Sequence, residues 1–285
     1  MKRLILALAL AALPVVAAQA QTYPEARRIV AIGGPVTELI FALGAGDRVI
    51  ARDTTSTYPE EVNALPDVGY MRQLSAEGVL SVDPDLIVTR DTAGPLEALD
   101  QLRAAAIPMV EVHDGFSPEA VIAAMRRVGT ALGLPEEGEA LARQAEADFA
   151  ELARRTAGGP VARVMFVLSN QGGRLNVAGA GTGADGLITL AGGENVMAAE
   201  FQGYKILSDE AIIAAAPDVI VMMERTGTAA LDQMRGGVME LPAVRLTPAG
   251  RNDALLRVPG AALGFGPRTA AFAQDLHARF VAAVQ

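Results

Sequence analysis

The sequence contains no cysteine, and this absence excludes a disulfide framework. Stability must therefore come from an ordinary apolar core, and 51% hydrophobic residues are ample for one. Attachment of a lipid at an export cleavage site needs a thiol, so we expect no lipid anchor. No apolar stretch beyond the first twenty residues is long and uninterrupted enough for a bilayer span, so we expect no membrane insertion.

Histidine, tryptophan and basic clusters are also scarce. Zinc and manganese sites usually use several histidines with carboxylates, and the chain has only His113 and His277. There is no tryptophan and only 4% aromatic residues, which weakens the case for a ligand held mainly by aromatic walls. The net charge of −9, with no basic cluster, argues against nucleic-acid binding.

The first twenty residues predict export. Lys2 and Arg3 precede an apolar run over 4–18, and Ala18-Gln19-Ala20 has the small-x-small pattern of a cleavage site. This order is typical of a secretory signal peptide, and the run is too short for a usual membrane span. We expect cleavage after Ala20 and a mature chain that diffuses in the periplasm.

The remaining chain has two halves with a similar pattern. The segment LSAEGVLSVDPDLIV (74–88) matches LSDEAIIAAAPDVIV (207–221), and a Gly-Tyr pair precedes each. Each segment reads as a short helix with a serine N-cap, then a buried strand. ELIFALGAGDRVIA (38–51) and GLITLAGGENVMA (186–198) both read as a helix, a glycine-rich stop and a strand. Strands alternate with helices throughout, which predicts an α/β fold with mostly parallel sheets.

A long amphipathic pattern lies between the halves. Pro135 opens it, and Leu141, Ala145, Phe149 and Leu152 share one face. We therefore predict a signal peptide at 1–20, an N-terminal lobe at 21–133, a linking helix at 134–158 and a C-terminal lobe at 159–285. Two Rossmann-like lobes joined in this way leave a ligand cleft between them, at the carboxyl ends of their strands.

The paired segments and the long helix resemble the cluster A substrate-binding proteins of ABC importers, which capture siderophores, cobalamin, heme and some metal ions. The stretch 53–88 is more specifically similar to the heme (hemin) branch. The segment Val68-Gly69-Tyr70-Met71-Arg72, with LSAEG at 74–78, carries most of that likeness. The resemblance implies capture of heme and its delivery to the permease dimer of an ABC transporter in the inner membrane.

Tyr70 is the candidate axial ligand of the heme iron, because the resemblance places the ligating tyrosine there and a phenolate oxygen suits ferric iron. By its residue type alone, Tyr70 would more often be an ordinary packed tyrosine with a bonded hydroxyl, and the match of its motif is what favours ligation. Arg72 is a candidate partner for a propionate, and Met71 for a contact with the porphyrin or, less readily, a sulfur ligand.

The second half offers further candidates. The resemblance implies an arginine from the opposite lobe near the ligating tyrosine, and Arg225, at the end of DVIVMMER, is the match. Tyr204 is expected to line the opposite wall of the cleft. Arg90, at the end of the matching first-half strand, is a weaker candidate. His113 could face the cleft, whereas His277 reads as exposed or structural.

Glu77 and Glu210 hold equivalent places in the two repeats. The resemblance implies that one such glutamate on each lobe docks on arginines of the permease. Each carboxylate also suits the N-terminus of its own helix, where the dipole favours negative charge. We expect the protein itself to be a monomer.

Two other interpretations stay open. A siderophore or cobalamin would suit the same fold. A nucleotide-dependent exported enzyme, a different class, is suggested only by Gly179-Ala180-Gly181-Thr182-Gly183-Ala184, which fits G-x-G-x-x-A, with Glu200 roughly where an acid that binds ribose would lie. That motif is weak in a chain with 29 glycines, and no serine-hydrolase or zinc-protease motif is present, so we predict that the protein is not an enzyme.

Overall fold

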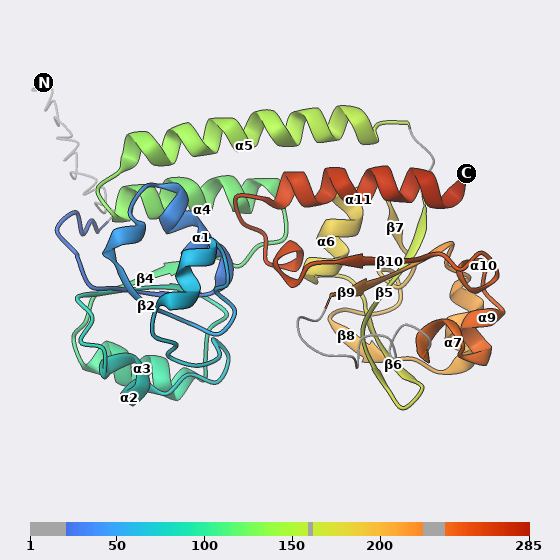
Figure 1. The fold of residues 1–285 in the computed structure, drawn as a ribbon, viewed down its shortest axis with the longest axis horizontal. Helices are drawn as coiled ribbons and strands as arrows, with labels where there is room; N and C mark the ends of the chain where they lie inside the picture. Colours follow the sequence, from blue (N-terminus) through green and yellow to red (C-terminus); the bar gives the residue numbers. More distant parts are fainter. Residues whose placement is uncertain (1–20, 159–161, 225–236) are drawn as a thin grey trace, which may run out of the picture.

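The computed structural model describes residues 21–158, 162–224 and 237–285. The predicted α/β fold is confirmed, with one sheet in each half of the molecule (Figure 1). The first sheet is parallel throughout, with strand order β2-β1-β3-β4. Its strands are β1 (Ile29–Ile32), β2 (Val49–Arg52), β3 (Leu86–Arg90) and β4 (Met109–Val112).

The second sheet runs β10-β9-β5-β6-β8, with β7 also paired to β5. Its strands are β5 (Arg163–Gln171), β6 (Arg174–Ala178), β7 (Glu194–Asn195), β8 (Tyr204–Ile206), β9 (Val219–Met223) and β10 (Leu255–Val258). Its β10, β9, β5 and β7 pair in parallel, whereas β6 pairs antiparallel with both β5 and β8. The reason is a tight turn at Gly172 and Gly173, both with positive φ, which returns the chain directly as a hairpin.

Three long helices form a layer along one side of both sheets: α4 (Pro118–Ala131), α5 (Pro135–Thr156) and α11 (Thr269–Val284). Helix α5, light green in Figure 1, passes over α4 in the first half and over α11 in the second. Its buried stripe includes Ala145, Phe149 and Leu152, as predicted, whereas Leu141, the fourth predicted position, is only partly buried and Ala142 is buried beside it. A single apolar cluster runs beneath this layer from Ile29 to Phe280, so both halves share one core.

The other helices cover the remaining faces. They are α1 (Gly34–Ala42), η1 (Gly46–Arg48), η2 (Glu60–Ala64), α2 (Ala76–Leu80), α3 (Leu96–Ala104), α6 (Gly183–Leu190), α7 (Asp209–Ala215), α9 (Pro242–Arg245), α10 (Pro248–Arg251) and η3 (Gly260–Leu263). The repeated segments adopt matching structures: Ser75 caps α2 before β3, and Ser208 caps α7 before β9, each hydroxyl accepting a backbone N–H at 3.3 Å. None of the helices in the described ranges is long and apolar enough to cross a membrane.

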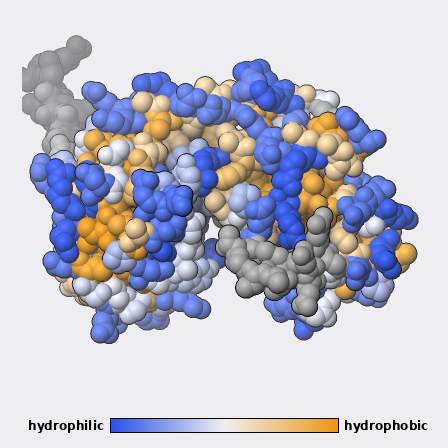
Figure 2. All heavy atoms as spheres, viewed as in Figure 1, coloured by the Kyte–Doolittle hydropathy of each residue, from blue (hydrophilic) through white to orange (hydrophobic). Residues whose placement is uncertain are grey.

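The carboxyl ends of the parallel strands in the two halves face one another. The chain that follows β1 meets the chain that follows β10, because Gly264 and Gly266 lie against Pro35 with no room for a side chain. On the side of the molecule away from α5, the surface is hollowed between the two halves (Figure 2). Loops at the strand ends therefore border a cleft, which is where α/β proteins bind ligands.

Candidate ligand-binding site

Tyr70 follows a segment attached to the edge of the first sheet. Arg52 in β2 donates its N–H to the carbonyl of Pro66 at 2.9 Å and accepts the N–H of Val68, also at 2.9 Å. These two hydrogen bonds extend the sheet beside β2 and direct the chain toward the carboxyl ends of the strands. The Tyr70 side chain is 39% exposed, so its phenol is available to a ligand.

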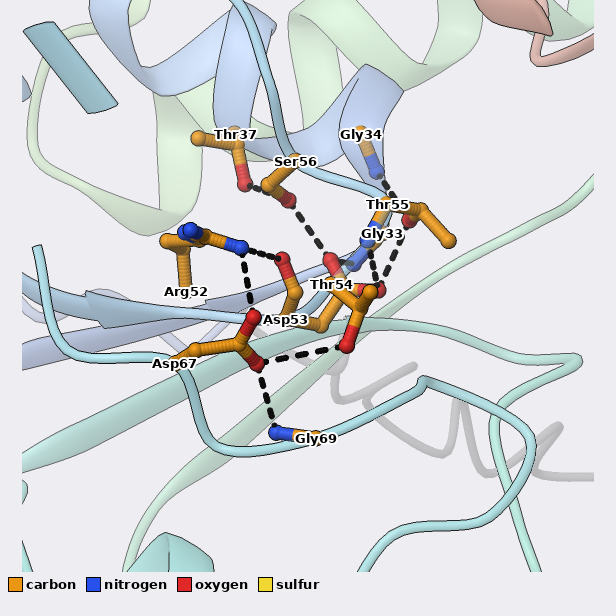
Figure 3. A network of polar contacts seen from close by, with 10 residues as sticks. All are labelled: Gly33, Gly34, Thr37, Arg52, Asp53, Thr54, Thr55, Ser56, Asp67 and Gly69. Carbon is orange, nitrogen blue, oxygen red and sulfur yellow. Dashed lines mark hydrogen bonds and ion pairs between the residues drawn. The ribbon is translucent and has the colours of Figure 1, made fainter. Parts of the chain in front are cut away.

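The backbone around Tyr70 is held by hydrogen bonds on both sides, and Figure 3 shows the one between Asp67 and Gly69. Gly69 has φ +101°, a conformation that residues with a side chain rarely adopt. Its N–H donates to Oδ1 of Asp67 at 2.8 Å, and its carbonyl accepts the N–H of Thr54 at 3.0 Å. Beyond it, the carbonyl of Tyr70 accepts the N–H of Gln73 at 2.8 Å. The candidate ligand therefore leaves the backbone at a defined point.

A second polar cluster, centred on Asp53, lies next in the chain to Thr54, whose N–H binds the carbonyl of Gly69. Asp53 is fully buried, and its Oδ1 accepts Gly33 N–H at 2.9 Å and the Ser56 hydroxyl at 2.6 Å. Its Oδ2 accepts both the N–H and the hydroxyl of Thr55, at 3.0 and 2.7 Å. Four donors satisfy the buried carboxylate, as burial of such a group requires. The cluster joins the end of β2 to the start of α1 (Figure 3).

Arg72 and Tyr204 lie close enough across the two halves to interact electrostatically. Burial raises the pKa of the Tyr204 phenol above its ordinary value, and the Thr182 hydroxyl and the positive charge of Arg72 partly oppose that rise. Arg72 is exposed on the first lobe, while Tyr204 begins the edge strand β8 of the second and is 41% exposed. Ile206 lies two residues further on the same face of β8 and is also exposed.

Met71 and Arg90 have partners within the first lobe. Met71 is 6% exposed and packs in an apolar cluster with Val68 and Leu74, which favours a packing role over contact with a ligand. Arg90 is also buried and forms an ion pair with Asp114. Burial, and secondarily the nearby charge of Arg72, lowers the pKa of Arg90 to about 10, so its guanidinium still carries its charge at neutral pH.

The two histidines have separate roles. His113 is largely exposed at the end of β4, and its Nδ1 lies 2.8 Å from Oδ2 of Asp91. The Nδ1 of His277 lies 3.0 Å from the carbonyl of Ala191, where it joins α11 to the end of α6. His277 is thus structural, one of the two alternatives expected for it. Arg225, the candidate arginine of the second lobe, lies outside the described residues.

The glycine loop that resembles a dinucleotide motif has a packing explanation. A side chain at Gly179 would collide with the carbonyl of Phe201, and one at Gly183 with the carbonyl of Leu263. The N–H of Gly181 donates to Asp185 at 3.1 Å. Internal packing and hydrogen bonding therefore account for these residues without a bound nucleotide.

Glu77 and Glu210 both lie exposed in the first turn of their helices, α2 and α7. A hydrogen bond to its own backbone N–H, and a further one with Ser208, lower the pKa of Glu210. The two glutamates therefore hold equivalent places in the sequence of α2 and α7, and these helices lie on opposite halves of the molecule (Figure 1).

Comparison with known proteins identifies the class. Residues 29–262 match the family model described as periplasmic binding protein, and the chain belongs to this family.

Two solved structures are especially similar. The periplasmic heme-binding protein RhuT from Roseiflexus sp. RS-1, in its apo form, is 39% identical with a TM-score of 0.84, covering 91% of this chain and 99% of that one. The periplasmic heme-binding protein BhuT, in complex with two hemes, is 36% identical with a TM-score of 0.84, covering 90% and 99%. Among curated proteins, a vitamin B12-binding protein of Yersinia pestis (strain Pestoides F) is 27% identical over 197 residues, 69% of each chain.

Proposed function

We propose that this protein captures heme in the periplasm and delivers it to the permease of an ABC importer. The observation that carries the proposal is Tyr70: an exposed tyrosine, on a backbone fixed on both sides, in the segment that pairs with the end of β2. Similarity to heme-binding proteins at 36–39% identity over nearly the whole chain supports it. The relatives are substrate-binding proteins, which supports transport rather than catalysis.

The chemistry of ferric heme suits these residues. Its iron is a Lewis acid that favours a hard anionic oxygen, which Tyr70 supplies as a phenolate. A free phenol ionises only near pH ~10, so the iron itself and a nearby cation must stabilise the anion. Arg72, two residues along the chain and exposed, is the cation we assign to this role or to a propionate. In this proposal Tyr204 and Ile206 form the apolar wall on the second lobe.

Arg225 stays in the proposal as the cation of the second lobe. Met71 is kept only as support beneath Tyr70, since it lies in the core. In the same proposal, Glu77 and Glu210 dock on the permease dimer, residues 1–20 direct export with cleavage after Ala20, and the binding protein acts as a monomer. Two carboxylates on related lobes match a two-fold symmetric partner.

A hemin titration followed by absorbance tests the proposal. The mature chain (21–285) should give a saturable change with a spectrum of the high-spin, oxygen-ligated type. Tyr70→Phe removes only the hydroxyl and should lose that spectrum, whereas Tyr23→Phe, which removes a phenol outside the cleft, should keep it. Absence of any saturable change in the wild type would overturn the heme proposal.

Cobalamin is the second candidate, because the Yersinia relative is a vitamin B12-binding protein. The same titration with cyanocobalamin, read by calorimetry, separates the two. Binding of cobalamin without binding of hemin would transfer the function to that ligand and leave the fold and family unchanged.

A further inference from the structure

A carboxylate just before Tyr70 makes several contacts with the turn that carries this tyrosine. Asp67 lies three residues before Tyr70, and one of its oxygens, Oδ1, accepts the N–H of Gly69 at 2.8 Å and the hydroxyl of Thr54 at 3.3 Å. This single oxygen thus contacts both segments that hold Gly69, since the N–H of Thr54 binds the carbonyl of Gly69.

The other oxygen of Asp67 is held by Arg52. The Nη1 atom of Arg52 lies 2.7 Å from Oδ2 of Asp67 and also donates to the carbonyl of Asp53 at 3.1 Å. The Arg52 side chain is only 13% exposed, and the Asp67 side chain 39%. The arginine is therefore fixed to β2 while the aspartate is fixed to the arginine (Figure 3).

We infer that Asp67, held by Arg52, is a positioning residue for the Tyr70 ligand. The inference rests on the proposed function, in which Tyr70 binds the iron. Gly69 has a positive φ, and a Cβ added there would meet no atom within 4 Å, so its surroundings are open on that side. The hydrogen bonds to its N–H and carbonyl are what hold it there. Without Asp67, the peptide before Tyr70 can rotate, and the phenol samples positions from which it cannot reach the iron.

Preorganisation predicts a specific effect on hemin binding. In the wild type the turn becomes ordered when the protein folds. In a variant without Asp67 it would have to become ordered when hemin binds, and this entropic cost lowers the affinity for hemin. For Asp67→Ala we expect affinity to fall by about tenfold, which corresponds to about 1.4 kcal/mol. The tyrosinate spectrum should also become incomplete at saturation, because a fraction of the bound hemin is not coordinated by Tyr70.

Two variants make the test specific. Asp67→Asn keeps one oxygen that can accept the N–H of Gly69 but turns a donor NH2 toward Arg52, so its affinity and its tyrosinate spectrum should lie between those of the wild type and Asp67→Ala. Asp100→Ala is the control: Asp100 pairs with Arg103 at 2.8 Å on the exposed face of α3, and its removal should change neither affinity nor spectrum. Thermal unfolding of each variant establishes that the binding assays compare folded proteins.

Should Asp67→Ala prove too unstable to assay, Gly69→Ala provides the second variant. The added methyl group meets no atom within 4 Å, so only the backbone torsion is penalised, and the same incomplete spectrum is expected. Gly44→Ala is its control, with φ +77° and equally open surroundings far from Tyr70 in the sequence.

The outcomes separate the two proposals. If wild type and Tyr70→Phe behave as expected but neither Asp67→Ala nor Gly69→Ala differs from its control, the positioning role is wrong and heme capture stands. If the wild type binds no hemin, the proposed function itself fails.

Discussion

Arg268 and Glu38 form a bidentate ion pair that joins the lobes, although 230 positions separate them in the sequence. The Nε and Nη2 atoms of Arg268, at the start of α11, donate to the two carboxylate oxygens of Glu38 in α1 at 3.0 and 2.8 Å. The Arg268 guanidinium also stacks 3.6 Å from the ring centre of Tyr58. With the shared core beneath α5, this contact favours a small range of lobe motion.

The first prediction concerns this ion pair. Arg268→Ala leaves the carboxylate of Glu38, only 9% exposed, without its partner, and should lower the free energy of unfolding by about 1–3 kcal/mol in a urea titration. Small-angle scattering of the unliganded variant should show a larger radius of gyration. Arg143→Ala breaks an exposed pair within α5 and is the control, with an expected change under about 0.5 kcal/mol. Equal effects of the two variants would contradict the interlobe role.

The second prediction concerns Asp53. Asp53→Ala leaves four donors without their buried acceptor, and should cost about 3 kcal/mol or more in the free energy of unfolding. Asp47→Ala, at an exposed position in η1, should change it by no more than about 0.5 kcal/mol. A loss below about 1 kcal/mol for Asp53→Ala, measured by the same urea titration, would mean that water or rearrangement replaces the carboxylate.

The third prediction follows from the raised pKa of Tyr204. A phenol whose pKa is higher in the folded than in the unfolded state stabilises the fold below the unfolded value of ~10, and this contribution is lost as pH rises through the folded pKa. In an alkaline absorbance titration of phenolate, Tyr204→Phe should remove a late portion, one that ionises above the ordinary value of ~10. Tyr23→Phe removes a phenol elsewhere, and removal of the same late portion by both variants would speak against the burial of Tyr204.

The fourth prediction separates docking from binding. Glu77→Lys combined with Glu210→Lys should leave hemin affinity unchanged, because both side chains are exposed on α2 and α7. Hemin uptake through the cognate importer, reconstituted in liposomes, should fall at least about tenfold, because like charges then oppose each other at the contact. Glu137→Lys, exposed at the start of α5, is the control. Unimpaired uptake by the double variant would rule out these docking residues.

The sequence predicted most of the strands and the linking helix, including a strand at the end of 186–198, where the structure has the two-residue β7. It did not predict the antiparallel pairing of β6 or the three-residue β8, which is too short to carry a pattern of its own. The hairpin between β5 and β6 had a signal in Gly172-Gly173, the type of residue pair that favours a tight turn. The strand β10 was also missed, since its LLRV segment lacks clear alternation.

The sequence motif around Tyr70 could be recognised in advance, but the contacts that its neighbouring residues make could not. Tyr70 follows from the resemblance of its segment, and its exposure agrees with that assignment. Adjacent residues of such a loop can point to opposite sides, and Met71 accordingly lies in the core where a ligand contact was expected. Asp67 and Arg52 had no distinguishing pattern, because their link depends on the pairing of residues 66–68 with β2.

The sequence by itself determined the class of fold, the repeated half-patterns, the serine caps and the position of the linking helix, because each depends on residues near one another in the chain. Only the tertiary structure decided which side chains meet across the lobes, as Arg268 meets Glu38. It also decided that Asp67 supports the turn before Tyr70. These contacts depend on how the lobes and the sheet edge come together, and no local pattern encodes that arrangement.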